Sequence, residues 1–266
     1  MQGSDGNFYG TTYSGGQSGL GTVYKITPRG ILTVLHTFQA TAEGFSPISG
    51  LVQGRDGSFY GTTPNGGSDS DGTAFKISPG GTFTSLHSFA ETDGRSPGGT
   101  LVQGTDGNFY GGTGYGGTND IDGTIFKMTA AGAVTTVHDF DGTDGTDPFP
   151  LVQDTSGTFF GTTGGGGDFT CQPSYGCGTV FRLSVGLGPF IEPLPTVGKV
   201  GTRVTILGTN LTGSTSVSFN GVAAAFTVLS SFEITTTVPT GATTGTVEVV
   251  TPKKTLKSKV AFHIPG

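Results

Sequence analysis

Three histidines recur at one place in a repeating sequence. His36, His87 and His138 follow one another at intervals of 51 residues. If the imidazoles faced a common channel, they could bind a transition metal or act as acid–base groups. The alternative is that each His satisfies a buried turn of its own repeat, because repeats also copy structural residues. The fourth repeat lacks this His, which favours the structural interpretation.

One loop concentrates carboxylates. The segment "DFDGTDGTDP" contains Asp139, Asp141, Asp144 and Asp147. Glycoside hydrolysis uses two carboxyl groups, one as acid and the other as base or nucleophile. Asp141 and Asp144 therefore join the three His as candidate catalytic residues. Acids in a Gly/Thr-rich loop are also ordinary turn formers, and that alternative stays open.

Two further loops carry paired acids. "SDSDGT" holds Asp69 and Asp71, and "TNDIDGT" holds Asp120 and Asp122. Carboxylates two residues apart can point oxygens at one Ca²⁺, which takes six to eight oxygen ligands. Calcium is therefore a possible cofactor of these two loops. Solvated polar loops are the alternative, since the matching loop of the first repeat, "GQSGLGT", has no acid.

Aromatic and cysteine residues supply the remaining candidates. Tyr9, Tyr60 and Tyr110 each follow a Phe in a strand-like segment, so they could stack on sugars or pack between repeats. Cys171 and Cys177 lie in "CQPSYGC", where we expect a local disulfide and hence a location outside the cytoplasm.

The elements that position these residues repeat about every fifty residues. "DGNFYGTT" at residue 5 returns at residues 56, 106 and 156 in close copies. "GTVYKI"-type segments, "LTVLHTF"-type segments and "LVQ" recur in register with it. Each segment is short, β-rich and bounded by turn residues, and DG predicts a hairpin turn. The unit is a four-stranded antiparallel meander, which is typical of a propeller blade.

The terminal repeats are incomplete. The first copy lacks the LVQ strand and the fourth lacks the LHTF strand, so 3 + 4 + 4 + 3 gives 14 strands where four whole blades need 16. Either the sequence is part of a longer protein or two chains complete each other. We favour the first explanation, because Met1 falls inside a repeat and "MQGSDGNF" is not a signal peptide.

The pattern "LVQGxDGxFYGTT…GTxFKI…TxLHxF" resembles the GloVer repeat, the Gloeobacter–Verrucomicrobium type, over residues 1–184. The resemblance implies an extracellular protein with propeller-like repeats. It implies no catalytic residues. We place this repeat domain at residues 1–186.

Residues 187–266 form the second predicted domain. "GTRVTILGTNL", "VSFNGVAA" and "ITTTVPTGATTGTVEVVTP" resemble the IPT/TIG family of immunoglobulin-like domains. Short alternating strands with regular turn signals independently predict a β-sandwich. The resemblance implies a spacer or accessory module. "PKKTLKSK" is predicted to be a Lys-protected strand edge rather than a polyanion site.

The distribution of charged residues limits the kinds of partner that the chain is expected to bind. Residues 1–186 carry 16 acidic and 7 basic side chains (net −9), and residues 187–266 carry 3 acidic and 6 basic (net +3). An acidic repeat region argues against nucleic acid, whose phosphates require clustered Lys and Arg. No segment approaches the ~20 apolar residues needed to span a bilayer, so we expect no membrane insertion.

The predicted fold class is all-β: a propeller-like array of about four four-stranded repeats, the terminal ones incomplete, plus an immunoglobulin-like sandwich. The first functional hypothesis is a secreted or cell-surface binding or scaffold protein. It would recognise a polysaccharide or a surface protein through the variable loops 64–71, 114–122 and 164–177. The second hypothesis is an extracellular polysaccharide hydrolase or lyase, and the third is a homo-oligomer or filament joined through open blade edges.

Overall fold

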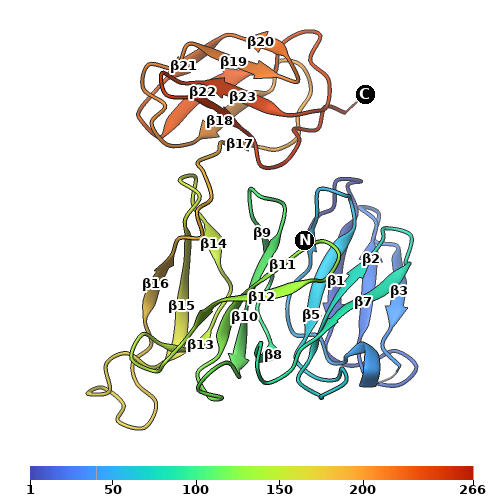
Figure 1. Cartoon of the computed structure of the whole chain (residues 1–266). Coiled ribbons are helices and arrows are strands. Elements are labelled where there is room, and N and C mark those ends of the chain that lie inside the picture. Colours follow the sequence, from blue (N-terminus) through green and yellow to red (C-terminus); the bar gives the residue numbers. More distant parts are fainter. Residues whose placement is uncertain (40, 266) are drawn as a thin grey trace. The chain divides into compact units, whose positions relative to one another are not determined.

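The computed structural model describes residues 1–39 and 41–265 of the chain. It divides into two compact units, one of residues 1–152 and 159–183 and the other of residues 153–158 and 184–266. Both units are built from antiparallel sheets, so the prediction of an all-β protein is confirmed (Figure 1). No helix within the described ranges has the length and apolar character needed to span a bilayer.

The first unit contains four small sheets, numbered here as blades in chain order (Figure 1). Blade 1 comprises β1 (Phe8–Thr12), β2 (Thr22–Ile26) and β3 (Leu32–Thr37), and it is followed by the short 3-10 helix η1 (Thr41–Glu43). Blade 2 comprises β4 (Val52–Gln53), β5 (Phe59–Thr63), β6 (Thr73–Ile77) and β7 (Phe83–Ser88), and blade 4 comprises β13 (Thr146–Pro148), β14 (Val152–Gln153), β15 (Phe159–Gly165) and β16 (Val180–Leu183). Blade 3 has five strands: β8 (Arg95–Pro97), β9 (Val102–Gln103), β10 (Phe109–Tyr115), β11 (Thr124–Met128) and β12 (Val134–Asp139). Within a blade, the LVQ, FYGTT, GTVYKI and LTVLHTF segments are neighbours in that order, as predicted.

The innermost strand of a blade differs from the prediction in two ways. It is longer than LVQ and is interrupted, because β8 and β9 both pair with β10, and β13 and β14 occupy the same places in blade 4. In blade 1, Gln2 forms a bridge with Phe8, as Gln53 does with Phe59. Met1 and Gln2 thus supply the end of an inner strand that the sequence had suggested was missing altogether.

The DG turn of each complete motif is closed by its own aspartate. In blade 2, Asp56 Oδ1 accepts the Ser58 N–H (3.1 Å) and Asp56 Oδ2 accepts the Tyr60 hydroxyl (2.8 Å). Gly57 between them has a φ of +79°, a region that residues with a Cβ rarely adopt. The recurrence of Asp, Gly and Tyr therefore reflects one hydrogen-bonded turn that is copied from blade to blade.

Adjacent blades are joined by pairs of aromatic rings, of which two are stacked and the third, Tyr110–Phe159, is tilted by 39°. The tyrosine of one blade lies on the first phenylalanine of the next, with ring centroids 3.8 Å apart for Tyr9–Phe59, 4.0 Å for Tyr60–Phe109 and 4.5 Å for Tyr110–Phe159. All six rings are buried. Such pairs contribute about 0.5–1.5 kcal/mol beyond the burial of their area. A single repeat cannot bury these rings alone, so the repeats must stack as an array.

Hydrogen bonds reinforce the blade-to-blade contact. In blades 2 to 4 the threonine of the "GT" segment donates its hydroxyl to a carbonyl of the preceding blade: Thr73 to Glu43 (3.1 Å), Thr124 to Asp93 (3.1 Å) and Thr179 to Asp144 (2.8 Å). A carbonyl that accepts such a bond is not left unsatisfied between sheets. The GT segment is therefore repeated for structural reasons.

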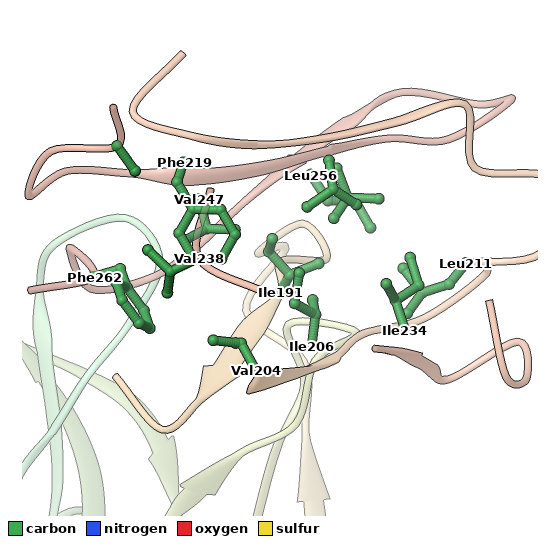
Figure 2. Close-up of a cluster of buried hydrophobic side chains, with 13 residues drawn as sticks. Ile191, Val204, Ile206, Leu211, Phe219, Ile234, Val238, Val247, Leu256 and Phe262 are labelled. Carbon is green, nitrogen blue, oxygen red and sulfur yellow. The ribbon is translucent and has the colours of Figure 1, made fainter. Parts of the chain in front are cut away.

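The second unit is an immunoglobulin-like sandwich. One sheet has the order β17-β18-β22-β21 and the other has the order β20-β19-β23-β24. Their bounds are β17 Glu192–Leu194, β18 Arg203–Leu207, β19 Ser216–Phe219, β20 Val222–Ala224, β21 Phe226–Val228, β22 Glu233–Thr237, β23 Val247–Val250 and β24 Thr255–Lys257. Side chains from both sheets form the core, among them Val204, Ile234, Phe219 and Val247 (Figure 2).

The lysine-rich segment 252–259 lies at a sheet edge, as the sequence predicts. β24 is an edge strand of its sheet and pairs with β23 alone among the strands. Lys257 Nζ contacts Glu248 Oε1 (2.8 Å), Lys253 and Lys254 are exposed, and Lys259 Nζ lies 5.7 Å from the centroid of the Phe190 ring. Lysines along a sheet edge discourage pairing with another chain.

Candidate functional site

The three repeated histidines do not converge. They lie on β3, β7 and β12, the outermost strands of their sheets, on the side away from the inner strands. Each Nε2 faces a carboxylate of its own blade: His36–Glu43 at 3.3 Å, His87–Asp93 at 2.8 Å and His138–Asp144 at 2.7 Å. The channel-facing arrangement is therefore wrong, and each His serves its own turn. For His36, burial holds the pKa below its usual value despite the opposing effect of Glu43.

The histidine–carboxylate pair was not anticipated, although the sequence contains a signal for it. Glu43, Asp93 and Asp144 each stand six or seven residues after the His and directly before a Gly. Asp93 Oδ1 also accepts the Ala90 N–H (2.9 Å), and Asp144 Oδ1 accepts the Asp141 N–H (3.1 Å). The acid thus closes the loop and orients the ring. This role accounts for Asp144, which the sequence suggested as a catalytic residue.

The three repeated tyrosines are unavailable to a sugar. Tyr9, Tyr60 and Tyr110 are buried between blades, and each donates its hydroxyl to the aspartate of its own DG turn. Burial and that aspartate raise the pKa of Tyr9 to about 12. The sugar-stacking role is corrected accordingly, and the inter-blade packing that the sequence left as an alternative is the role observed.

The paired acids of the two variable loops point to different partners. Asp120 Oδ1 contacts Arg95 Nη2 (2.6 Å), whereas Asp122 is buried and its pKa is raised by burial, then by Asp141 and Asp144. Asp69 accepts the Ser68 hydroxyl (2.6 Å), while burial raises the pKa of Asp71. Within the described residues, no three acidic, His or Cys side chains are grouped as metal ligands.

Asp141 acts as a turn former. Its Oδ1 accepts the Thr143 hydroxyl (2.6 Å) and the Thr143 N–H (2.9 Å), and these bonds hold its pKa below the usual value. A carboxylate stabilised in its ionised form and exposed in a loop is poorly suited to donate a proton. Of the four acids in this segment, Asp147 has a different environment.

Asp147 is half-buried between two blades, on β13. A methyl group built on Gly114 of blade 3 would lie 3.2 Å from Asp147 Oδ1, and one built on Gly164 of blade 4 would lie 3.1 Å from Oδ2. The repeat position of Gly114 and Gly164 is occupied by Tyr13 in blade 1 and by Pro64 in blade 2. The glycines therefore leave room for the carboxyl group only between blades 3 and 4.

The electrostatic setting of Asp147 is also distinct. Burial raises its pKa. The carboxyl group of Asp147 can accept further hydrogen bonds, and it is partly shielded from water.

One exposed tyrosine, Tyr175, lies beside Asp147, and a second, Tyr115, lies near Tyr175. The methyl position on Gly164 that is near Asp147 Oδ2 also lies 3.2 Å from the Tyr175 hydroxyl oxygen. Burial raises the pKa of Tyr175, with smaller contributions from the charges of Asp147 and Tyr115. Tyr115 is 52% exposed and Tyr175 is 46% exposed. Their rings can meet a ligand while their hydroxyls and the carboxyl supply polar contacts.

Local structure holds both rings in place. Tyr175 lies in the loop closed by the Cys171–Cys177 disulfide, whose prediction is confirmed, and its carbonyl accepts the Gly166 N–H (2.7 Å). Tyr115 ends β10 opposite Arg95, whose guanidinium lies 6.0 Å from the ring centroid. Asp147, Tyr115, Tyr175 and Arg95 are named here the Asp147 site.

Sequence comparison identifies two families along the chain. The family described as the Gloeobacter/Verrucomicrobia repeat matches residues 1–190, and the IPT/TIG domain matches residues 191–264. Comparison with curated proteins found no match.

Solved structures share a similar trace at low identity. A luciferin-regenerating enzyme is 15% identical with a TM-score of 0.47, over 71% of this chain and 61% of that protein. An inactive virginiamycin B lyase from Staphylococcus aureus, solved with quinupristin, is 12% identical with a TM-score of 0.47, over 97% and 78%. A gluconolactonase from Xanthomonas campestris is 14% identical with a TM-score of 0.45, over 90% and 70%. Likeness at this level assigns no activity.

Proposed function

Because the chain belongs to the Gloeobacter/Verrucomicrobia repeat family and carries an IPT/TIG domain, we propose that it is a secreted or cell-surface binding protein that recognises carbohydrate through the Asp147 site. The observation that carries this proposal is the placement of the half-exposed Tyr175 beside the half-buried carboxyl group of Asp147, with the half-exposed Tyr115 near Tyr175. Aromatic faces stack on the apolar faces of sugar rings, while a carboxyl group accepts hydrogen bonds from hydroxyls. The IPT/TIG domain would act as a spacer.

The disulfide supports an extracytoplasmic location. A disulfide persists in oxidising compartments and is rare where thiols are kept reduced. Here it closes the loop that carries Tyr175, so reduction would loosen one wall of the proposed site. Location and binding are therefore linked in this proposal.

Binding is proposed ahead of hydrolysis because no ion pair or side-chain hydrogen bond joins Asp147 to a second carboxyl group within the described residues. Glycosidases require a second carboxyl group about 5–10 Å from the first, with its charge influencing the first. Burial raises the pKa of Asp147. The hydrolase or lyase remains the second candidate, because a half-buried carboxyl with a raised pKa is suited to donate a proton.

The experiment is affinity electrophoresis of the purified protein in gels containing plant and bacterial polysaccharides. Tyr115→Ala and Tyr175→Ala should each abolish the retardation caused by a bound glycan. Tyr13→Ala is the matched control, since Tyr13 is 61% exposed but lies in blade 1, away from the Asp147 site. Equal loss in all three variants, or retention in all three, would contradict the proposal.

The same polysaccharides are incubated with protein and examined for released oligosaccharides by mass spectrometry. Products that disappear in Asp147→Asn would establish the enzyme instead of the binding protein. Binding without products is the result expected.

A further inference from the structure

The surroundings of the Asp147 site carry an excess of negative charge. Residues 113–179 contain eight acidic side chains and a single basic one, Lys127. Lys127 lies opposite Tyr110 near the start of β10, and Asp154 lies in the turn before β15, so neither is at the end of the blades where β10 reaches Tyr115. The other seven acids lie in the loops and strand ends on the side of the site: Asp120, Asp122, Asp139, Asp141, Asp144, Asp147 and Asp168.

Two basic side chains that lie among these acids are already paired. Arg95 Nη2 contacts Asp120 Oδ1 at 2.6 Å, and His138 Nε2 contacts Asp144 Oδ2 at 2.7 Å. The carboxyl group of Asp147 has neither an ion pair nor a hydrogen bond within the described residues. A ligand that enters the site therefore meets negative charge that the chain has not neutralised.

Asp122 extends this excess of charge below the surface. It is 7% exposed, and its carboxyl group has no ion pair or hydrogen bond in the part of the chain that the structure describes. Burial raises the pKa of Asp122, and the charges of Asp141 and Asp144 raise it further. The Asp122 carbonyl accepts the Asp147 N–H (3.1 Å), which links this buried acid directly to the site. A positive charge nearby is stabilised more strongly in such a partly buried setting than in water.

The Asp147 carboxyl and the Tyr175 hydroxyl face the same space. A methyl position on Gly164 lies 3.1 Å from Asp147 Oδ2 and 3.2 Å from the Tyr175 hydroxyl oxygen. A protonated amine has three N–H donors, so one such group can donate to both oxygens, whereas a sugar hydroxyl has a single proton to give. The face of a tyrosine ring also attracts a cation.

We propose that the ligand of the Asp147 site is a carbohydrate whose sugar rings carry free, protonated amines, such as a polymer of glucosamine. The inference rests on the carbohydrate-binding function proposed above and adds the charge of the ligand to it. The amine neutralises Asp147 through a charge-assisted hydrogen bond, and the sugar ring stacks on Tyr175. The same acids disfavour glycans built of uronic acids, because like charges at an interface oppose binding.

The test compares two hexasaccharides, one of glucosamine and one of N-acetylglucosamine, by isothermal titration calorimetry of the whole chain. At about pH 6 a carboxyl group is ionised and an amine is protonated. The two ligands differ only at the nitrogen, where acetylation removes the charge and leaves one N–H donor. The glucosamine hexamer should bind at least about tenfold more tightly, and its affinity should fall as salt is raised from about 50 to about 500 mM.

Variants of Asp147 assign the effect to the site. Asp147→Asn and Asp147→Ser should each lower the affinity for the glucosamine hexamer at least about tenfold. Ser occupies this position as Ser46 and Ser96 with φ of 53°, against 54° for Asp147, so the serine variant keeps the backbone of the blade. Glu192→Gln is the matched control, because it removes one negative charge from an exposed position on β17 of the second unit and should leave the affinity unchanged.

The outcomes separate this inference from the function on which it rests. Equal affinity for the two hexamers, or tighter binding of polygalacturonate, would overturn the amine assignment and leave carbohydrate binding in place. A hexalysine peptide that binds as tightly as the glucosamine hexamer would overturn it too, because charge alone would then be recognised. Failure of both hexamers and of every polysaccharide in the electrophoresis would contradict the proposed function as well.

Discussion

Replacing the same phenylalanine in two blades tests the stacking that holds the array together. Phe109 is buried and its ring centroid lies 4.0 Å from that of Tyr60 in the preceding blade. Removing a buried Phe side chain costs about 3–5 kcal/mol of unfolding free energy. Phe8 occupies the same motif position but is 45% exposed. Phe109→Ala should therefore destabilise the repeat unit strongly, and Phe8→Ala should cost under about 1 kcal/mol.

The protein supplies its own spectroscopic reporter. It contains no Trp, and its seven Tyr all lie between residues 9 and 175, so Tyr fluorescence follows unfolding of the repeat unit without a contribution from the IPT/TIG domain. With an m-value of about 2 kcal/mol/M, the loss expected for Phe109→Ala lowers the urea midpoint by roughly 2 M. The m-value is compared between variants, because arrays of repeats can lose cooperativity. The measurement is made at low protein concentration, where self-association is minimal.

Similar losses for the two variants would refute this reasoning, since the substitution and the motif are identical and only the covering ring differs. A small effect of Phe109→Ala would refute it as well. Tyr60→Phe separates the ring from its hydroxyl: the stack is kept, the bond to Asp56 is lost, and the expected cost is about 1 kcal/mol.

Two predictions concern ionisation. Burial raises the pKa of Asp147, so the charged form of this side chain opposes folding, and the stability of the protein falls as the pH rises through the folded-state pKa. Asp147→Asn should therefore raise the melting temperature at neutral pH by roughly 2–4 °C and give no gain below about pH 4. Calorimetry measures both melting temperatures. Tyr9, with its pKa raised to about 12, should make the repeat unit lose about 1.4 kcal/mol for each pH unit between about 10 and 12. A Tyr9→Phe variant with an unchanged slope in urea titrations over this range would contradict that assignment.

The strands could be predicted because four copies agree in spacing and alternation. The inner-strand segments β8 and β13 were missed for a physical reason. Each is three residues long and ends in Pro, and the residue before that Pro, Ser96 or Asp147, has φ near +54°. Short strands with Pro lack the alternation that sequence patterns detect. Their pairing depends on contacts supplied by the rest of the blade.

The roles of some candidate residues could be predicted from the sequence, and the roles of others depend on contacts made only in the folded array. The disulfide follows from spacing, and the histidine–carboxylate pair could have been found from the acid that precedes a Gly after each His. The environment of Asp147 could not have been found from the sequence, because Asp147 is one of four acids in a single loop. Its burial depends on Gly114 and Gly164, which belong to two other strands and become its neighbours only in the folded array.

The Asp147 site arises where the repeats differ while their backbone stays the same. Ser46 and Ser96 hold the position of Asp147 in the earlier blades, with φ of 53° and 53° against 54°. In all three blades the N–H of this residue donates to a carbonyl of the preceding blade, from Leu20, Asp71 and Asp122 respectively. The scaffold bonds are therefore unaffected by which side chain is present. A change from Ser to Asp alters the chemistry without altering the blade, and glycines at the flanking positions make room for it. Repeated residues thus maintain the array, and ligand recognition can vary at positions that the array leaves unconstrained.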